Sequence, residues 1–314
     1  MSCINGNVDL TPFISPWWLP GGHLQTIYAA LRPPPRPPLA RERWDTPDGD
    51  FIDVDFAGDA AAPRRLALFH GLEGSSDSHY ARAIAAQAAQ RGWRVALPHF
   101  RGCSGEPNRM PRAYHSGDTE EIDWVLRKFK SPLFVVGISL GGNALLKWLG
   151  ERGAGAASLV RRAAAVSAPI DLAAAGRALD RGLNRLLYTR RFLATLRPKS
   201  LAKLERFPGL YDAAVVRAAR SFRAFDDAVT APLHGFRGVD HYWSAASSGP
   251  WLERIRVPTL LLNARNDPFL PEHALLAAAR NAASCVLVEF PRNGGHAGFQ
   301  HPWLAQRVLQ FLDP

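Results

Sequence analysis

The feature that most constrains the fold is an apolar run that leads into a serine flanked by glycines. Residues 133–138 read LFVVGI, Ser139, Leu140 and Gly141 follow at once, and a helical pattern covers residues 143–151. Strand, sharp turn and helix in this order form a nucleophile elbow, in which only glycine fits two residues before and after the serine. The turn lifts the Ser139 hydroxyl clear of the sheet and sets the Leu140 N–H beside any oxyanion that forms. The spacing predicts a nucleophilic serine, with a merely tight turn as the alternative.

Length and composition indicate a globular protein. The chain has 314 residues, enough for two average domains or for one large α/β domain with an insertion. Hydrophobic residues make up 47% and charged residues 21%. Cys3, Cys103 and Cys285 give neither a disulfide framework nor a CxxC metal pair. No apolar run reaches the roughly 18 residues that span a bilayer, and residues 1–10 lack a signal-peptide pattern, so we expect a cytoplasmic protein.

The positive charge is concentrated in one segment. The net charge is +10, and counting along residues 170–223 gives twelve Lys or Arg against four Asp or Glu. Arginine richness can simply reflect genome composition; the alternative is attraction of anionic substrates or of a membrane surface. No nucleic-acid-binding motif accompanies the charge, so we expect no nucleic-acid partner.

Strand and helix patterns alternate along most of the chain. Residues 41–46 and 51–56 predict an antiparallel hairpin at a sheet edge. Strand patterns follow at 66–70, 94–99, 133–139, 163–168, 258–265 and 285–290, and helical patterns at 80–91, 119–130, 272–281 and 299–312. Such alternation predicts an α/β fold with a mostly parallel eight-stranded sheet and helices on both faces.

Two segments depart from the alternation. Residues 170–250 are helical and basic, with aromatic and leucine residues interleaved, and they follow the sixth strand. An insertion there would lie over the strand ends where ligands bind, which predicts a helical lid. Residues 1–40 read as an N-terminal arm packed on the core. Within it, residues 16–27 are too aromatic and too rich in Gly and Pro for an ordinary helix start, and residues 32–38 (RPPPRPP) predict an extended spacer. The core then comprises residues 41–169 and 251–314.

A nucleophilic serine needs a base, and the base needs a group that orients it. Asp267 follows the strand pattern at 258–265, and His296 lies in the loop after the next strand. Both belong at the same sheet edge as Ser139, so we expect a Ser139-His296-Asp267 triad. The alternatives are Asn263 or Glu289 for the acid and His301 for the base.

A second oxyanion donor is expected in the glycine-rich turn at residues 70–76, HGLEGSS. We assign it to the Leu72 N–H, which would act together with the Leu140 N–H. His70 is more plausibly a structural or oxyanion-loop residue than a second base. Residues 101–105 (RGCSG) are expected to form a site wall, because Glu106 stands where a second elbow would need glycine. The residues expected to bind substrate are His70, Gly71, Cys103 and Asn143.

Cofactor motifs are missing from the sequence. It contains no HExxH, no GxxxxGK[ST], no GxGxxG and no Cys/His ligand set. We therefore expect neither a metal ion nor a nucleotide cofactor.

Several longer motifs carry a family resemblance. They are WLPGGHLQTI (18–27), HGLEGSS (70–76), FRGCSGEPNR (100–109), GISLGGN (137–143), FDD followed by Thr230, and GGHAGF (294–299). Over residues 11–312 the chain resembles the YheT-type branch of the α/β-hydrolases, which includes bacterial esterases and animal lipid-hydrolysing proteins. The resemblance implies a carboxylic ester hydrolase for medium or long acyl chains, with the triad at Ser139, Asp267 and His296. Two alternatives remain: acyl transfer through the same serine, and a non-catalytic scaffold that binds a lipid or a partner.

Overall fold

A single eight-stranded sheet forms the centre of the molecule. The computed structural model describes residues 12–129 and 131–314, and the strand order is β1-β2-β4-β3-β5-β6-β7-β8. The strands are β1 (Ala40–Asp45), β2 (Phe51–Ala57), β3 (Arg65–Phe69), β4 (Arg94–Pro98), β5 (Leu133–Ile138), β6 (Val160–Val166), β7 (Thr259–Leu262) and β8 (Val286–Glu289). Strand β2 is antiparallel to both of its neighbours, and β3 to β8 are mutually parallel. The predicted mostly parallel sheet is confirmed.

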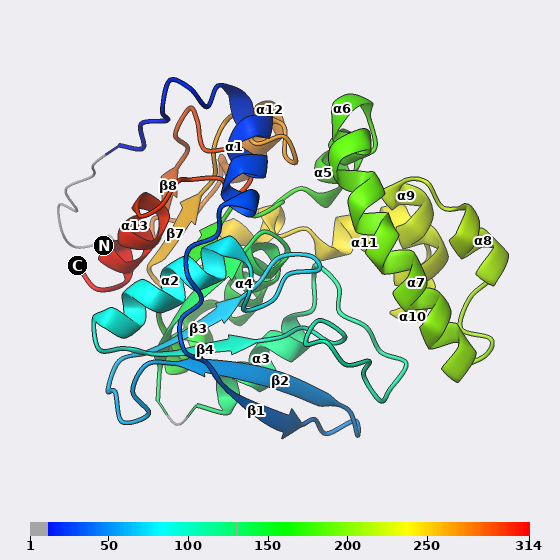
Figure 1. Ribbon diagram of the computed structural model, residues 1–314, viewed down its shortest axis with the longest axis horizontal. Helices are drawn as coiled ribbons and strands as arrows, with labels where there is room; N and C mark the ends of the chain where they lie inside the picture. The colour runs from blue at the N-terminus through cyan, green and yellow to red at the C-terminus, as the bar shows by residue number, and fades with distance from the viewer. Residues whose placement is uncertain (1–11, 130) are drawn as a thin grey trace.

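Helices cover both faces of this sheet (Figure 1). Helices α2 (His79–Gln90) and α13 (Trp303–Leu312) pack on one face, with a buried apolar layer between them and the strands. Helices α3 (Thr119–Arg127), α4 (Leu140–Arg152) and α12 (Glu272–Ala279) pack on the other face. The 3-10 turn η1 (Gly153–Ser158) leads from α4 to β6, and η4 (Gly249–Arg254) precedes β7. Because both faces are covered, most residues of the parallel strands are apolar and buried on both sides of the sheet.

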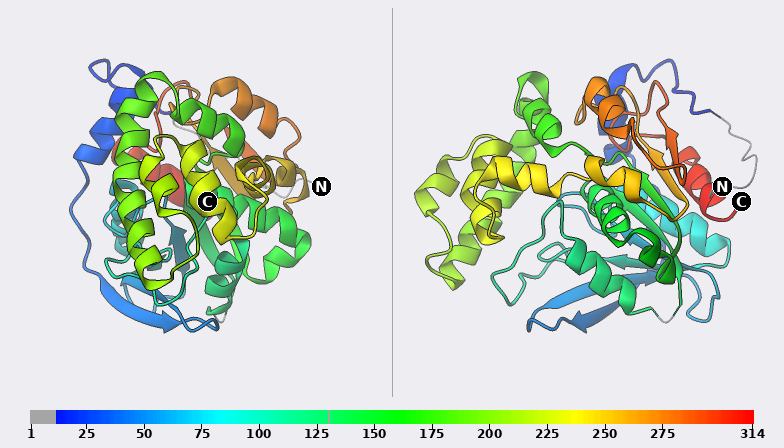
Figure 2. Two further views of the ribbon diagram at one scale, coloured as in Figure 1. Left: turned by 90° about the vertical axis from the view of Figure 1, so that its right-hand side faces the viewer. Right: turned by 180° about the vertical axis from the view of Figure 1, so that it is seen from behind.

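The segment between β6 and β7 consists of helices joined by short loops and contains no strand. Its elements are α5 (Leu172–Leu179), α6 (Gly182–Asn184), η2 (Arg185–Thr189), α7 (Arg190–Arg206), α8 (Ala213–Ala218), α9 (Phe222–Phe225), η3 (Asp226–Thr230), α10 (Ala231–Leu233) and α11 (Val239–Ala246). Figures 1 and 2 show these helices as a block at one end of the sheet. Both η2 and η3 are π-turns, a rare geometry that is frequent at functional sites. The insertion follows the sixth strand, as the sequence predicts.

The N-terminal arm contains a helix, which corrects the expectation that residues 16–27 are not helical. Helix α1 spans Gly21–Leu31 and follows Pro20. Its inner face is made by Gln25, Thr26 and Ala29, whose spacing of one and four residues is that of one helix side. The contacts of Gln25 and Thr26 with the core stabilise the helix, although Gly21 and Gly22 at its start have low helix propensity. Residues 33–39 are extended, as expected, and residues 1–11 lie outside the described part.

Two further observations concern the cysteines and the apolar length of the helices. Cys103 is a free thiol, whereas Cys285 is disulfide-bonded, a bond that the spacing of the cysteines did not indicate. Within residues 12–129 and 131–314, no helix is long and apolar enough to cross a bilayer.

Candidate active site

The turn between β5 and α4 holds Ser139 in a strained conformation. Its φ of 54° and ψ of −118° lie in a region that L-residues seldom adopt. A Cβ added at Gly137 would lie 2.5 Å from the Gly141 carbonyl oxygen, and one added at Gly141 would lie 2.6 Å from the His70 carbonyl oxygen. The backbone therefore requires glycine on both sides of the serine, as the spacing predicts.

The three side chains expected to form a triad lie in hydrogen-bond contact. His296 Nε2 is 2.8 Å from Ser139 Oγ, and His296 Nδ1 is 2.9 Å from Asp267 Oδ2 and 3.2 Å from Oδ1. With Nδ1–H donated to the carboxylate, Nε2 is left to accept the serine proton. The arrangement has the contacts of a nucleophile, a base and a group that orients the base.

Phe269 restricts both partners of the serine. Its backbone N–H donates to Asp267 Oδ1 at 2.8 Å, and its ring stacks on the His296 imidazole with 3.9 Å between centroids. Asp267 is 5% exposed and His296 9% exposed. The carboxylate and the imidazole are therefore held against rotation and mostly shielded from water.

Helix α1 braces the two loops that carry Asp267 and His296. Thr26 Oγ1 accepts the His296 N–H at 2.8 Å and donates to the Gly22 carbonyl. Gln25 Oε1 accepts the Gly294 N–H at 2.8 Å and the side-chain amide of Asn266 at 3.0 Å. The sequence did not lead us to predict that α1 supports the site. The local indication was two adjacent polar residues, Gln25 and Thr26, in a mostly apolar stretch.

The two expected oxyanion donors, Leu72 and Leu140, both line the cavity above Ser139. Neither N–H has an acceptor among the described residues. The turn that carries Leu72 is fixed by two tyrosine hydroxyls: Tyr80 accepts the Gly71 N–H at 2.9 Å, and Tyr114 accepts the Glu73 N–H at 2.9 Å. Two fixed N–H groups near the serine can stabilise an oxyanion.

Asn263 and Glu289, the two alternatives to Asp267, make other contacts. The Asn263 amide bonds to the backbone of Ala168, and Glu289 forms an ion pair with Arg307. Neither side chain is the partner of His296, whose Nδ1 contacts Asp267.

The remaining reactive side chains near the site are uncharged. Burial lowers the pKa of His70 to about 3. Its Nδ1–H donates to the Gly71 carbonyl, and its Nε2 accepts the Phe100 N–H. Burial raises the pKa of the Cys103 thiol to about 12, so the nucleophilic thiolate is scarce at neutral pH. His70 is a structural residue and Cys103 part of the wall.

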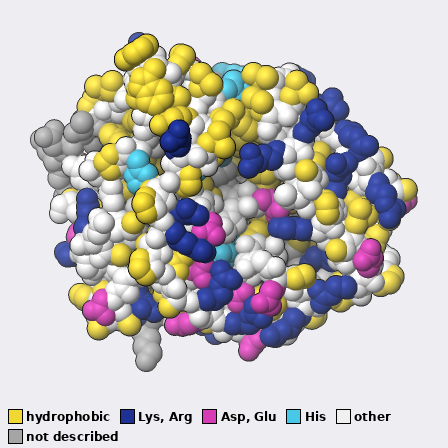
Figure 3. All heavy atoms as spheres, in the orientation of Figure 1, with side chains coloured by type: hydrophobic (Ala, Val, Ile, Leu, Met, Phe, Trp, Pro, Cys, Tyr) yellow, Lys and Arg dark blue, Asp and Glu magenta, His cyan; other side chains and the backbone are white. Residues whose placement is uncertain are grey.

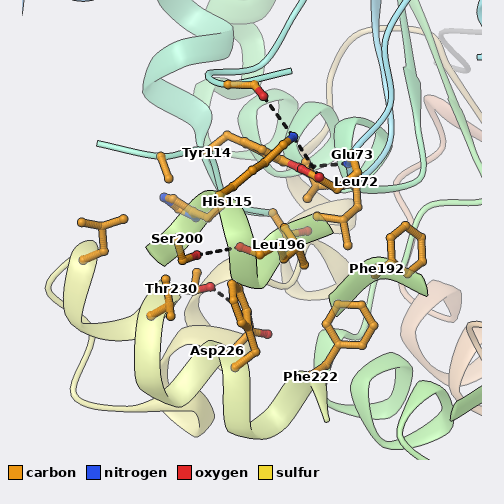
Figure 4. Close-up of a pocket in the computed structure, with 18 of the residues that line it drawn as sticks. Leu72, Glu73, Tyr114, His115, Phe192, Leu196, Ser200, Phe222, Asp226 and Thr230 are labelled. Atoms are coloured by element: carbon orange, nitrogen blue, oxygen red, sulfur yellow. Dashed lines mark hydrogen bonds and ion pairs between the residues drawn. The ribbon is translucent and has the colours of Figure 1, made fainter. Parts of the chain in front are cut away.

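A cavity of about 580 Å³ extends from Ser139 into the inserted helices (Figure 4), a size typical of ligand pockets. Apolar side chains from the insertion make up much of its wall: Leu172, Phe192, Leu196, Phe222, Phe225, Val229 and Trp243. Polar and charged residues also line it, among them Glu73, Arg101, His115, Lys199, Lys203, Arg206 and Asp226. The cavity therefore offers an apolar ligand a large and mostly apolar surface beside the serine.

Three of the four residues expected to bind substrate do not line this cavity. Cys103 does, whereas His70, Gly71 and Asn143 are not among the residues that line it. Gly71 lies against Ser139, because a Cβ there would be 3.0 Å from the serine Cβ. Asn143 is fully buried, and its amide bonds to Ser116, Ala246 and Ser248. Glycine and asparagine near the elbow thus serve the scaffold.

Part of the insertion's positive charge attaches it to the core. Lys199 pairs with Glu73 at 2.8 Å. Lys203 donates to three consecutive backbone carbonyls, those of residues 110–112, and Arg206 donates to the Asn108 carbonyl. These cations hold α7 against the loop at residues 102–112, so they do not form a free basic surface.

Comparisons with known proteins agree with this architecture. Residues 65–300 match the family model for the alpha/beta hydrolase fold. The chain is 38% identical over 288 residues to YheT of Escherichia coli (strain K12), named as an esterase, covering 86% of this chain and 84% of that protein. It is 30% identical over 302 residues to the phospholipase ABHD3 of Mus musculus, covering 92% and 72%.

Solved structures show the same fold. An esterase from Exiguobacterium antarcticum superimposes with a TM-score of 0.59 at 16% identity, covering 88% of this chain and 100% of that one. A serine hydrolase from Cycloclasticus gives 0.60 at 17% identity, covering 88% and 98%. The chain therefore belongs to the α/β-hydrolase family, in the branch that contains YheT and the ABHD3 phospholipases, and is a hydrolase of the carboxylic ester class.

Proposed function

We propose that this protein is a serine carboxylic ester hydrolase that cleaves medium- or long-chain acyl esters through a Ser139-His296-Asp267 triad. The observation that carries the proposal is the unbroken chain of contacts from the Asp267 carboxylate through His296 to the Ser139 hydroxyl, at 2.9 and 2.8 Å. Its position at the floor of an apolar cavity supports an acyl substrate.

The mechanism follows from the roles of these groups. His296 Nε2 takes the Ser139 proton as Oγ attacks the ester carbonyl, and the N–H groups of Leu72 and Leu140 hold the oxyanion. Collapse of the tetrahedral intermediate breaks the ester C–O bond, and His296 returns the proton to the leaving alcohol. Water then attacks the acyl-Ser139 ester, again with His296 as base, and releases the carboxylic acid. Asp267 keeps the imidazole in the required tautomer and stabilises its protonated form.

The inserted helices, residues 170–250, act in this proposal as a lid that holds the acyl chain. Phe192, Leu196 and Phe222 supply the apolar wall on the side away from the sheet. An acyl chain bound there loses contact with water, which contributes about 0.8 kcal/mol for each buried methylene. We therefore expect kcat/KM to rise with acyl length until the cavity is filled.

Steady-state hydrolysis of p-nitrophenyl esters from acetate to palmitate tests both parts. Ser139→Ala should lower kcat by on the order of a million-fold, because the nucleophile is lost while the fold is kept. The wild type should prefer esters longer than acetate. If Ser139→Ala retained turnover, Ser139 would not be the nucleophile. If the wild type preferred the acetate ester, the inserted helices would not bind the acyl chain.

A further inference from the structure

The exposed large apolar side chains gather on one rim of the molecule. Ten are exposed among the described residues, and seven of these come from two segments. We call them the apolar rim: Ile14 (81% exposed), Trp17 (91%), Trp18 (48%), Leu24 (49%), Leu31 (67%), Leu183 (53%) and Leu186 (59%). Figure 3 shows apolar side chains along the upper edge of the molecule, over α1 and α6 of Figure 1. A concentration of this kind on one face marks an interaction surface.

The two segments that form the rim adjoin each other. The His23 ring stacks on the Tyr188 ring with 5.7 Å between centroids, and His23 Nδ1 is 3.1 Å from the Tyr188 hydroxyl. Helix α1 is apolar on its outer face, at Leu24 and Leu31, while its inner face holds the loop of His296. The two segments of the rim are thus joined by a direct contact between side chains.

Basic residues predominate in the segments that carry the rim. Residues 12–38 and 181–204 contain no Asp or Glu and nine Lys or Arg, of which Lys199 and Lys203 contact the core and Arg36 pairs with Asp77. Arg181, Arg185 and Arg190 are exposed and form no ion pair with any described residue. If a second copy of the chain packed on this surface, these arginines would face the same arginines of that copy and repel them. An anionic surface would instead attract the arginines.

The rim also lies close to the catalytic base. Leu186 points outward from η2, and Tyr188, two residues on, is buried. The Tyr188 ring packs edge-on against Phe269, with 4.7 Å between centroids, and Phe269 stacks on His296. The rings of Tyr188 and Phe269 thus connect the rim to His296 through direct contacts.

We propose that the apolar rim docks the protein on an anionic lipid bilayer, with the tryptophans and leucines in the headgroup region and the arginines on acidic headgroups. Exposed Trp and Leu flanked by Arg are suited to the boundary between headgroups and acyl chains. The inference goes beyond the proposed function, since it concerns binding to a bilayer and not turnover.

Cosedimentation of the full chain with vesicles tests the proposal, with Ser139→Ala as the parent so that no lipid is hydrolysed. The parent should bind vesicles of phosphatidylcholine with about 30 mol% phosphatidylglycerol, should bind pure phosphatidylcholine more weakly, and should lose affinity in roughly 0.5 M NaCl. Adding Trp17→Ser, Leu183→Ser and Leu186→Ser should weaken binding at least about tenfold. On the wild-type background, the same three changes should leave hydrolysis of a short water-soluble ester unchanged.

The matched control is Val215→Ser with Val288→Ser, two exposed apolar side chains that lie outside the rim. This pair should bind vesicles as the parent does. Equal binding by the rim variant, or no binding by the parent, would overturn the inference and leave the proposed esterase intact. Sedimentation velocity that showed a dimer abolished by the rim changes would also overturn it, because the rim would then be a contact between two copies.

Discussion

At the residue scale, Asn143 shows how a buried amide can tie a site together without touching the ligand. Its side chain donates to the carbonyls of Ser116 and Ala246 and accepts the Ser248 N–H. Ser116 precedes α3, and Ala246 and Ser248 lie where the insertion rejoins the core. One residue in the first turn after Ser139 thus joins three separate parts of the chain.

Removing that amide should reduce stability more than substrate affinity. Asn143→Ala leaves buried carbonyls and an N–H without partners, each costing about 1–3 kcal/mol. We expect the free energy of unfolding in urea to fall by about 3 kcal/mol or more, with KM for a p-nitrophenyl ester within about twofold of wild type. A large rise in KM with unchanged stability would instead return Asn143 to the substrate site.

Asp226 places a carboxyl group in the apolar part of the cavity. It accepts bonds from Thr230 Oγ1 at 2.7 Å and Trp243 Nε1 at 2.8 Å. Burial raises its pKa to about 6. The folded state therefore binds this proton more tightly than the unfolded state, whose carboxyl titrates near 4, and stability must fall as pH rises between these values.

Asp226→Asn should remove that dependence. Relative to the variant, the wild type should lose about 2 kcal/mol of unfolding free energy between about pH 4.5 and pH 7.5. Urea unfolding of both proteins at the two pH values measures the difference. Asp240→Asn is the control, because Asp240 is exposed and pairs with Arg223, which lowers its pKa. An equal loss in wild type and Asp226→Asn would contradict the assignment.

At the scale of single elements, α1 has a mechanical role. Through Thr26 and Gln25 it fixes the loops of His296 and Asp267, and through His23 it contacts the insertion. A short helix near the start of the chain thereby sets the position of residues 241 to 270 positions later.

Thr26→Val tests this role, because valine keeps the shape and removes the acceptor of the His296 N–H. An unpaired buried N–H should displace the loop, and small misplacements of a base cost up to about 100-fold in rate. We expect kcat to fall tenfold or more for each active site titrated with a fluorophosphonate, with KM little changed and Thr26→Ser restoring the rate. Valine at the exposed Thr195 is the control. If the loss of rate in Thr26→Val were fully explained by the fraction of unfolded protein, Thr26 would have a structural role only.

Helix α7 provides a wall of the cavity on its inner side. Leu196 faces the cavity, and Thr195, its neighbour in the chain, is exposed. Leu196→Trp should fill part of the space and shift the preferred p-nitrophenyl ester to a shorter acyl chain, while Thr195→Trp should not. An unchanged chain-length profile in Leu196→Trp would place the acyl chain elsewhere.

The elements differ in how far the sequence predicted them. The strands and core helices are long, periodic and buried, and their positions agree with the patterns to within a few residues. Helix α1 was missed because its inner face consists of Gln25 and Thr26, whose partners lie on loops more than 200 residues away. Local pattern carries no information about such contacts. His70, Gly71 and Asn143 were expected to bind substrate but do not line the cavity. Local pattern does not show on which side of a wall a residue lies.

At the scale of the whole molecule, the parallel sheet brings the separate parts of the site together. Strands β5, β7 and β8 end at one edge, so Ser139, Asp267 and His296 meet although they come from three loops. This convergence was predictable, because carboxyl ends of parallel strands share an edge and the chain order of the three residues is that of the fold. The insertion completes the site by covering that edge with apolar side chains.

Labelling with a fluorophosphonate followed by peptide mass spectrometry tests whether Ser139 is the nucleophile. We expect a single adduct on Ser139, lost in Ser139→Ala and formed far more slowly in His296→Ala, where no base takes the serine proton. An adduct on another serine, or labelling that persists in Ser139→Ala, would contradict it.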